Sequence, residues 1–293
     1  MRALTVLLDS LVDYAGLFPP AQLSMEVAVA HYADYRQGPH RASLGRFIVP
    51  LARLAEFESC FQQLPPLPAE PWTLSVIGGS DPLADCRQIE QFNTRSVSVR
   101  IVALEIRALT VADVQHVTAR PFAPASIWVE LPAAAPELPA LLAAVKTAGQ
   151  HAKLRTGGVT PAAIPHPDDV AQFMIACRAA GVAFKATAGL HHAWRGEYAL
   201  TDEPDASVGT LFGFLNIFLA AALVQTNAPE ADVRALLEAR DPCDFTLTDD
   251  ALAWRDHRFT IEQLGQMRRT FCHSFGSCSF TEPIADLQAL HWL

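Results

Sequence analysis

The chain has 293 residues, of which 51% are hydrophobic and 18% are charged, and it carries a formal net charge of −9. This composition excludes a disordered chain and offers no basic surface for a nucleic-acid backbone. Six cysteines are scattered without a CxxC pair, which favours reduced thiols. Asp9 and Asp13 interrupt the apolar N-terminus, so no signal peptide is expected. We therefore expect a soluble cytoplasmic protein of bacterial type, with neither nucleic acid nor membrane as partner.

Short β-rich runs alternate with amphipathic stretches along the chain, a pattern typical of parallel βα units. The expected strands are 11–17, 46–50, 73–78, 97–106, 127–131, 151–156, 183–188 and 271–280. The expected helices are 24–36, 51–64, 81–92, 110–120, 136–148 and 166–180, each with apolar residues at spacings of three and four. No GxGxxG motif follows the first strand, so an open dinucleotide-binding sheet is disfavoured. The sequence predicts one (β/α)8 barrel of TIM type over residues 1–293.

Two segments after the seventh expected strand depart from this pattern. Residues 207–225 carry no charge and approach the length of a membrane span, but Gly209, Gly213 and Asn216 dilute the run, so we expect a buried helix. The same helix also suits a subunit interface in a homo-oligomer. Residues 227–270 are expected to form an insertion, with an extra helix at 228–240 and a hairpin at 245–259 that turns at Asp249-Asp250. This insertion could displace the eighth strand and leave the barrel incomplete.

Charged residues lie near the ends of four neighbouring strands: Glu105, Glu130, Lys153 and Lys185. Buried parallel strands are normally continuous apolar runs, so these charges are expected to point into the mouth of the barrel. Each charge alone fits an ion pair at a strand end. Together they indicate a functional site, because burying several charges costs several kcal/mol unless they pair or bind a ligand.

A lysine in a barrel mouth is chemically useful, because burial and a second nearby cation both disfavour its ammonium form. We therefore expect a lowered pKa for at least one of Lys153 and Lys185, which would give an amine nucleophile near pH 7. Alternatively, both lysines stay cationic and hold an anionic substrate together with Arg155. The sequence leaves both interpretations open.

Glycine and hydroxyl residues at the strand ends favour a small anionic substrate. Glycine lets backbone N–H groups approach a phosphate, and barrels often bind phosphate after strands seven and eight. The expected substrate-binding residues are Arg155, Thr156, Gly157, Gly158, Thr187, Gly189, His191, Gly276 and Ser277.

The segment from Lys153-Leu-Arg-Thr-Gly-Gly to Lys185-Ala-Thr-Ala-Gly resembles the two-lysine segment of deoxyribose-phosphate aldolases. The resemblance covers residues 153–190, with Arg155 in place of a small residue and Gly189-Leu190-His191 in place of a double glycine. It implies that Lys153 forms a Schiff base and that Lys185 lowers the pKa of Lys153.

Three further groups have alternative interpretations. His191 and His192 could join Glu105 and Glu130 as ligands of a divalent metal ion. Cys278 and His273 could form a nucleophile pair, although a buried thiol is the commoner arrangement.

Asp13, at the end of the first strand, either caps the following turn or supplies a carboxylate acid or base opposite the lysines.

The sequence thus favours a lyase or aldolase-type enzyme without a cofactor, acting on a small phosphorylated or carboxylated carbonyl compound. Lys153 or Lys185 would be the amine nucleophile, Glu130 or Glu105 the proton shuttle, and Arg155 the anion clamp. One alternative is a metal-dependent isomerase or lyase. Another is a non-catalytic binding or assembly protein that uses residues 207–225 as its interface.

Overall fold

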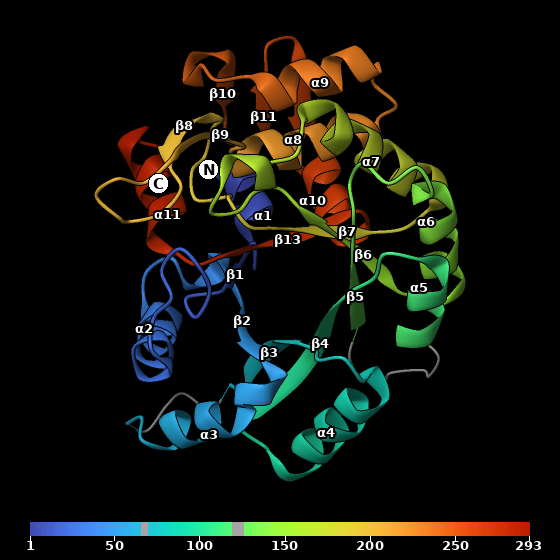
Figure 1. Ribbon diagram of the computed structural model, residues 1–293. Coiled ribbons are helices and arrows are strands. Elements are labelled where there is room, and N and C mark those ends of the chain that lie inside the picture. Colours follow the sequence, from blue (N-terminus) through green and yellow to red (C-terminus); the bar gives the residue numbers. More distant parts are fainter. Residues whose placement is uncertain (66–69, 119–125) are drawn as a thin grey trace.

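Eight parallel strands close into a barrel in the computed structural model, which describes residues 1–65, 70–118 and 126–293 (Figure 1). Around the barrel the strand order is β1-β13-β7-β6-β5-β4-β3-β2. The strands are β1 (Val12–Tyr14), β2 (Leu44–Pro50), β3 (Trp72–Ile77), β4 (Val99–Arg107), β5 (Ser126–Leu131), β6 (His151–Arg155), β7 (Phe184–Thr187) and β13 (Cys272–Ser277). The chain is therefore a (β/α)8 barrel of TIM type, as the sequence predicts.

Each expected strand overlaps one strand of the barrel. The first is shorter than expected, because the backbone N–H of Phe18 bonds to the carbonyl of Ala15 and turns the chain after Tyr14. β13 pairs with both β1 and β7, so the eighth strand completes the barrel and the incomplete alternative is wrong.

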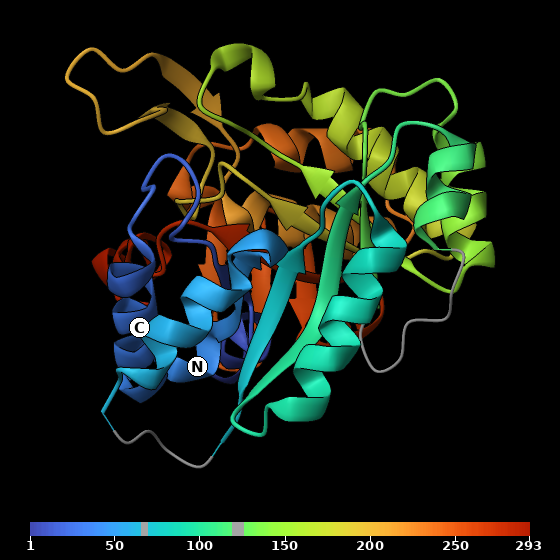
Figure 2. The ribbon, with the colours of Figure 1, turned by 60° about the horizontal axis from the view of Figure 1, so that its bottom comes forward.

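Helices follow the strands and cover the outside of the barrel (Figures 1 and 2). They are α2 (Met25–Gln37), α3 (Leu54–Gln62), α4 (Pro82–Arg95), α5 (Val111–Val117), α6 (Leu138–Thr147), α7 (Pro167–Ala180), α8 (Phe214–Gln225) and α11 (Thr281–Ala289). Several begin at a side-chain cap, such as Ser24, which accepts from the N–H of Val27, and Asp81, which accepts from the N–H of Ala84. The last two residues of the expected helix 110–120 lie outside the described residues.

The uncharged segment 207–225 is not one helix. Its first part forms β9 (Val208–Leu211), which pairs with β8 (Gly196–Ala199) in a hairpin, and α8 begins only at Phe214. Gly213 lies between the two, at a position where a Cβ atom would lie 2.2 Å from the backbone of Trp194. The helical part is buried from Phe214 to Val224 by α7, α9, α10 and β13 of the same chain. The apolar side chains of α8 are therefore not available to a subunit interface, whereas Val208 of β9 stays exposed.

Residues 207–225 approach the length of a membrane span in the sequence, but no helix among the described residues combines the length and apolarity needed to cross a membrane.

The segment before β13 contains more structure than the expected helix and hairpin. It comprises α9 (Glu230–Glu238), the antiparallel strands β10 (Phe245–Leu247), β11 (Ala251–Trp254) and β12 (His257–Thr260), and α10 (Ile261–Thr270). The expected turn at Asp249-Asp250 joins β10 to β11, and a second turn at Arg255, with φ of 51°, adds the third strand. The N-terminal helix α1 (Arg2–Leu8) packs against α10 and β11.

Four short 3-10 helices complete the described elements: η1 (Arg41–Ser43), η2 (Leu51–Arg53), η3 (Pro161–Ala163) and η4 (Pro242–Asp244). None of the six cysteines, all of which lie in the described ranges, is part of a disulfide.

The amide of Asn216 joins α8 to its surroundings. Its Oδ1 accepts from the backbone N–H groups of Arg195 and Gly213, and its Nδ2 donates to the carbonyls of Leu236 and Ala239. The side chain is fully buried, so water cannot replace these four bonds.

Replacing Asn216 with Ala should therefore lower the free energy of unfolding by about 2–4 kcal/mol, since several buried backbone groups lose their partner. The exposed Gln266→Ala substitution in α10 is the control and should change it by less than about 0.5 kcal/mol. Urea denaturation measures both. Equal stability of the two variants would contradict the role given to Asn216.

Candidate active site

Lysines and carboxylates alternate through the interior of the barrel. Lys185 Nζ lies 2.5 Å from Asp13 Oδ2 and 2.8 Å from Glu105 Oε1. Lys153 Nζ lies 2.9 Å from Glu105 Oε2 and 2.8 Å from Glu130 Oε2. The strand register explains the contacts, because Glu130 is paired with Lys153, and Lys153 with Lys185, across adjacent strands. The barrel thus brings together the four strand-end charges predicted from the sequence, together with Asp13.

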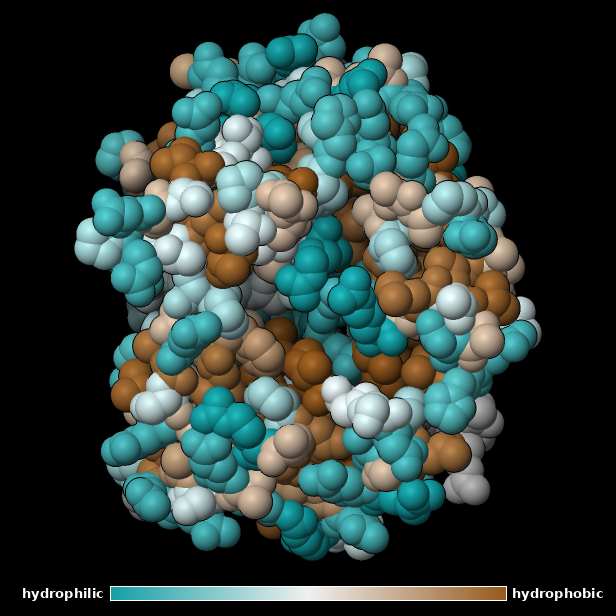
Figure 3. Space-filling model, viewed as in Figure 1, coloured by the Kyte–Doolittle hydropathy of each residue, from teal (hydrophilic) through white to brown (hydrophobic). Residues whose placement is uncertain are grey.

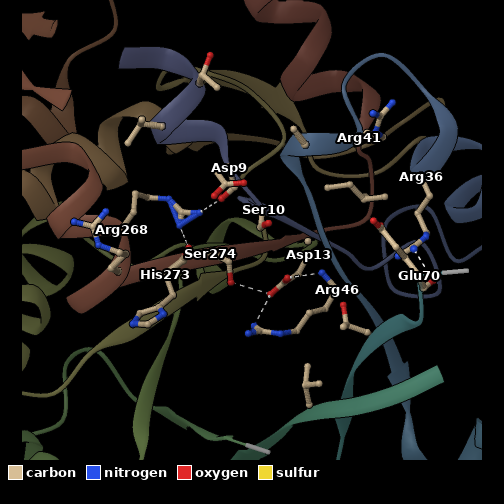
Figure 4. A pocket seen from close by; sticks show the side chains of 18 of the residues that line it. Asp9, Ser10, Asp13, Arg36, Arg41, Arg46, Glu70, Arg268, His273 and Ser274 are labelled. Carbon is tan, nitrogen blue, oxygen red and sulfur yellow. Dashed lines mark hydrogen bonds and ion pairs between the residues drawn. The ribbon is translucent and has the colours of Figure 1, made fainter. Parts of the chain in front are cut away.

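An arginine lies at each end of this series. Arg155 Nε donates to Glu130 Oε1 at 3.0 Å. At the other end, Arg46 contributes its backbone N–H to Asp13 Oδ1 at 2.8 Å, and its guanidinium lies 3.8 Å from Asp13 Oδ2 (Figure 4). We call the series Arg46, Asp13, Lys185, Glu105, Lys153, Glu130 and Arg155 the ion-pair chain.

Two serine hydroxyls support the buried carboxylates, and the sequence analysis missed both. Ser75 donates to Glu105 at 2.6 Å, and Ser274 donates to Asp13 at 2.8 Å (Figure 4). The available signal was a hydroxyl within an otherwise apolar strand, which is a weak indicator of function.

Mutual attraction outweighs burial for the groups of the ion-pair chain. Burial alone would raise the pKa of Glu105, but Lys153 and Lys185 lower this pKa by more than burial raises it. The carboxyl group therefore titrates well below its usual range. The pKa values of Asp13 and Glu130 are lowered in the same way by their cationic neighbours.

The same balance corrects the expected lysine chemistry. Burial lowers the pKa of Lys153, but Glu105 and Glu130 raise it more, so the pKa lies above its ordinary value. The predicted lowering is therefore wrong for Lys153. Two lysines on adjacent strands indicate repulsion, but in the barrel Glu105 lies between their ammonium groups.

A cavity of about 570 Å³ opens at the C-terminal ends of the strands, and we call it the upper cavity. Viewed toward this end, the molecule has a central hollow in which hydrophilic residues gather (Figure 3). Its lining includes Glu105, Arg107, Glu130, Lys153 and Arg155. Lys185 is 0% exposed and does not line it, so Lys153 is the buried lysine that a ligand in the upper cavity can reach.

Asp13 faces a different space. A second cavity, of about 1130 Å³, lies at the N-terminal end of the barrel and is lined by Asp13, Arg46, Arg268 and His273 (Figure 4). Asp13 was predicted as an acid or base opposite the lysines, but it contacts Lys185 from below and does not line the upper cavity.

The predicted substrate-binding residues fall into two groups. Those that line the upper cavity are Arg155, Gly158, Thr187, His191, Gly276 and Ser277. Thr156 instead is buried, and its hydroxyl donates to the carbonyl of Ala188.

Gly157 and Gly189 allow two loops to approach closely, because a Cβ atom on Gly157 would lie 3.0 Å from Gly189 Cα. Gly189 also has a φ of 76°, which favours glycine. Close packing of the two loops is therefore sufficient reason for glycine at both positions.

The two histidines after β7 contact acidic residues of α11. His191 Nδ1 lies 3.1 Å from Glu282 Oε2, and His192 Nδ1 lies 3.2 Å from Asp286 Oδ2. Within residues 1–65, 70–118 and 126–293, no group of three or more His, Cys, Asp or Glu side chains is arranged to hold a metal ion. The alternative metal site formed by Glu105, Glu130, His191 and His192 is therefore not assembled.

Cys278 contacts a different histidine from the one predicted. Its Sγ lies 3.8 Å from His191 Nδ1. His273 packs against Trp128 and His151, and burial, together with the charges of His151 and Arg268, lowers its pKa to about 4. The predicted pair of Cys278 and His273 is wrong, because the side chain of His273 points to the N-terminal end of the barrel.

Comparisons of the chain with family models, with curated proteins and with solved structures give no match. The function is therefore inferred from the chemistry of the site.

The ion-pair chain predicts how stability depends on pH. Its carboxyl groups have lowered pKa values. Their contribution to the free energy of unfolding is therefore present above the unfolded-state pKa, near 4, and is lost as the pH falls toward the folded-state values. Lys153 has a raised pKa, so its contribution is present below its ordinary pKa and is lost as the pH rises through the raised value.

We expect Lys185→Met to lower the free energy of unfolding by about 3–5 kcal/mol near pH 7, because it leaves Asp13 and Glu105 short of a cation. The loss should shrink between pH 5 and 3, where these carboxyl groups take up protons in the variant. Denaturant titrations at each pH measure it, with the exposed Lys146→Met as control. A loss of stability that is as large at pH 3 as at pH 7 would contradict the pairing of Lys185 with Asp13 and Glu105.

Proposed function

We propose that the chain is a lyase or aldolase-type enzyme that acts on a small phosphorylated or carboxylated carbonyl compound through a Schiff base on Lys153. One observation carries the proposal: Lys153 is a buried amine that faces the upper cavity between two carboxylates, both within 3 Å or so of its nitrogen.

Glu130 is the best-placed proton shuttle. Its Oε2 lies 2.8 Å from Lys153 Nζ, it lines the upper cavity, and Arg155 fixes its other oxygen. Because Lys153 rests as an ammonium, its proton must first pass to Glu130. The free amine then adds to the carbonyl carbon of the substrate, and the π electron pair of the carbonyl group moves to the oxygen. One proton of the nitrogen passes to that oxygen, which gives a neutral carbinolamine. Glu130 returns its proton to the carbinolamine hydroxyl, which leaves as water, and an iminium forms.

The carboxylates that raise the pKa of Lys153 also favour this product. An iminium nitrogen keeps the positive charge of the ammonium that it replaces, so Glu105 and Glu130 keep a cation beside them. The ion-pair chain therefore carries the same charge before and after the step. The iminium can then accept the electron pair of a neighbouring C–C bond as that bond breaks.

Lys185 has a positioning role in this scheme. It is fully buried and holds Glu105, which in turn holds Lys153. The resemblance implied that Lys185 lowers the pKa of Lys153, but Glu105 lies between the two ammonium groups and pairs with both.

The lining of the upper cavity supports an anionic substrate. Arg107 and Arg155 both line it, and guanidinium groups bind phosphate and carboxylate in two-pronged geometry. A volume of about 570 Å³ is within the range of small-molecule sites. The lack of a disulfide among the six cysteines, all of them described residues, is in keeping with the reducing cytoplasm as the place of action.

The raised pKa of Lys153 also supports a second candidate function. In it, Lys153 stays an ammonium and holds an anion together with Arg155, without forming a covalent bond.

Borohydride reduction separates the two functions. With small phosphorylated aldehydes and ketoses, we expect a reduced adduct on Lys153, located by peptide mass mapping, which is simple because the chain has three lysines. Lys153→Arg keeps the cation between Glu105 and Glu130 but cannot form an iminium, so it should give no adduct at this position. Lys146→Arg, at an exposed lysine, is the matched control and should keep the adduct on Lys153. Compounds that bind tightly but leave Lys153 unlabelled would reject the Schiff base in favour of the anion clamp.

A further inference from the structure

A second group of reactive side chains faces the upper cavity. Cys278 follows β13, His191 follows β7, and Glu282 lies in the first turn of α11. His191 Nδ1 lies 3.8 Å from Cys278 Sγ and 3.1 Å from Glu282 Oε2. The same imidazole nitrogen thus lies near both a thiol and a carboxylate, and none of these three groups belongs to the ion-pair chain.

Cys278 and His191 are also open to a ligand. Both line the upper cavity, beside Lys153, and both line an adjoining cavity of about 300 Å³. Cys278 is 8% exposed, so its sulfur is shielded from bulk water but is in contact with the cavity. Cys177 and Cys272, by contrast, are both 0% exposed within the hydrophobic core.

The charges around Cys278 favour proton transfer to the imidazole. Burial by itself lowers the pKa of His191, but Cys278 and Glu282 raise it to about 10, so the imidazole is basic enough to take up the thiol proton near pH 7. From β1, Tyr14 also faces the sulfur, and burial first, then Tyr35 and Cys278, raise its pKa, so it stays a neutral phenol. His191 first, and His192 to a smaller extent, lower the pKa of Glu282, which keeps this group a carboxylate beside the imidazole. Among these neighbours, His191 is the base for the thiol proton.

We propose that Cys278 is a second nucleophile of the upper cavity, activated by His191 and Glu282, and that it adds to the carbonyl carbon of a small anionic aldehyde. The aldehyde class rests on the proposed function, because C–C cleavage at Lys153 releases an aldehyde fragment into this cavity.

The step balances without any further reactant. The thiol proton passes to His191, a sulfur electron pair forms the C–S bond, and the π bond of the carbonyl group breaks toward oxygen. His191 then gives its proton to that oxygen, and the product is a hemithioacetal. No oxidation takes place, and the reverse steps release the aldehyde.

The first test uses iodoacetamide near pH 7 and follows alkylation of each cysteine by peptide mass mapping. We expect Cys278 to react at least about tenfold faster than the exposed Cys243, although it is far less accessible. Among the residues that the structure describes, no histidine contacts Cys243, and Asp241 beside it raises the pKa of its thiol. Alkylation of Cys278 no faster than that of Cys243 in the folded protein would overturn the proposal, and this comparison needs no variant.

The adjacent histidines supply a matched pair of variants. His191→Asn should slow alkylation of Cys278 by at least about tenfold, whereas His192→Asn, whose imidazole contacts Asp286, should leave it within about twofold of the unsubstituted protein. Equal effects of the two substitutions would reject activation by His191. Thermal unfolding of each variant verifies that the alkylation rates refer to folded protein.

The aldehyde class is tested in Lys153→Arg, which cannot form an iminium. Glyceraldehyde 3-phosphate should slow alkylation of Cys278 in this variant by at least about fivefold, and the protection should be lost on dialysis. Its matched control, glycerol 3-phosphate, has the same anionic group but no aldehyde and should give no protection. Equal protection by both compounds would show anion binding without C–S bond formation and would overturn the proposed addition.

The two proposals fail separately. Loss of borohydride trapping at Lys153 with a reactive Cys278 would reject the Schiff base alone. Trapping at Lys153 with an unreactive Cys278 would reject the second nucleophile alone.

Discussion

Charges buried inside a barrel must find partners, and in this molecule the ion-pair chain meets that constraint. Three carboxylates and four cations alternate from Arg46 at one end to Arg155 at the other. Isolated, each of these charges would cost several kcal/mol to bury. Each carboxylate instead lies between two cations, so the position of one side chain fixes that of the next, and the strand register determines the order.

The two lysines lie at different depths in the barrel and therefore differ in their access to a ligand. Lys185 is enclosed, with Asp13 below it and Glu105 above it, and the upper cavity does not reach it. Lys153 lies one step nearer the C-terminal ends of the strands and faces that cavity. In the ion-pair chain, the cationic nitrogen of Lys153 can face a ligand because Glu105 and Glu130 balance its charge. These carboxylates can pair with either an ammonium or an iminium at that position. In the proposed reaction, the chemistry therefore takes place at the open end of a rigid series of pairs.

The sequence predicted the barrel well, because buried parallel strands leave continuous apolar runs and the helices between them show regular spacing. It also predicted that Glu105, Glu130, Lys153 and Lys185 would come together, since charges at the ends of neighbouring strands must meet. The sign of the pKa shift of Lys153 depends on distances of about 3 Å, which strand alternation does not supply. The pattern indicated repulsion between lysines, whereas the fold inserts Glu105 between them.

Other features could not be predicted because they join segments far apart in the chain. His191 and Cys278 meet only because β7 and β13 are neighbours in the barrel, and no spacing along the sequence indicates that pairing. The strand at Val208–Leu211 depends on its partner β8, since an uncharged apolar run fits a helix equally well. Likewise, the tight contact between Gly157 and Gly189 is a property of two loops, which the sequence showed only as glycines after strands.

The most direct test of the account is a pH titration of the Lys153 Nζ signal by ¹⁵N nuclear magnetic resonance. The chain has three lysines, so selective labelling gives few signals, and Lys153→Arg identifies the one from Lys153. The account predicts that this nitrogen remains an ammonium beyond the ordinary lysine pKa, near 10.5, because Glu105 and Glu130 hold it. A Lys153 that loses its proton below that value would contradict the ion-pair chain as the basis of the site.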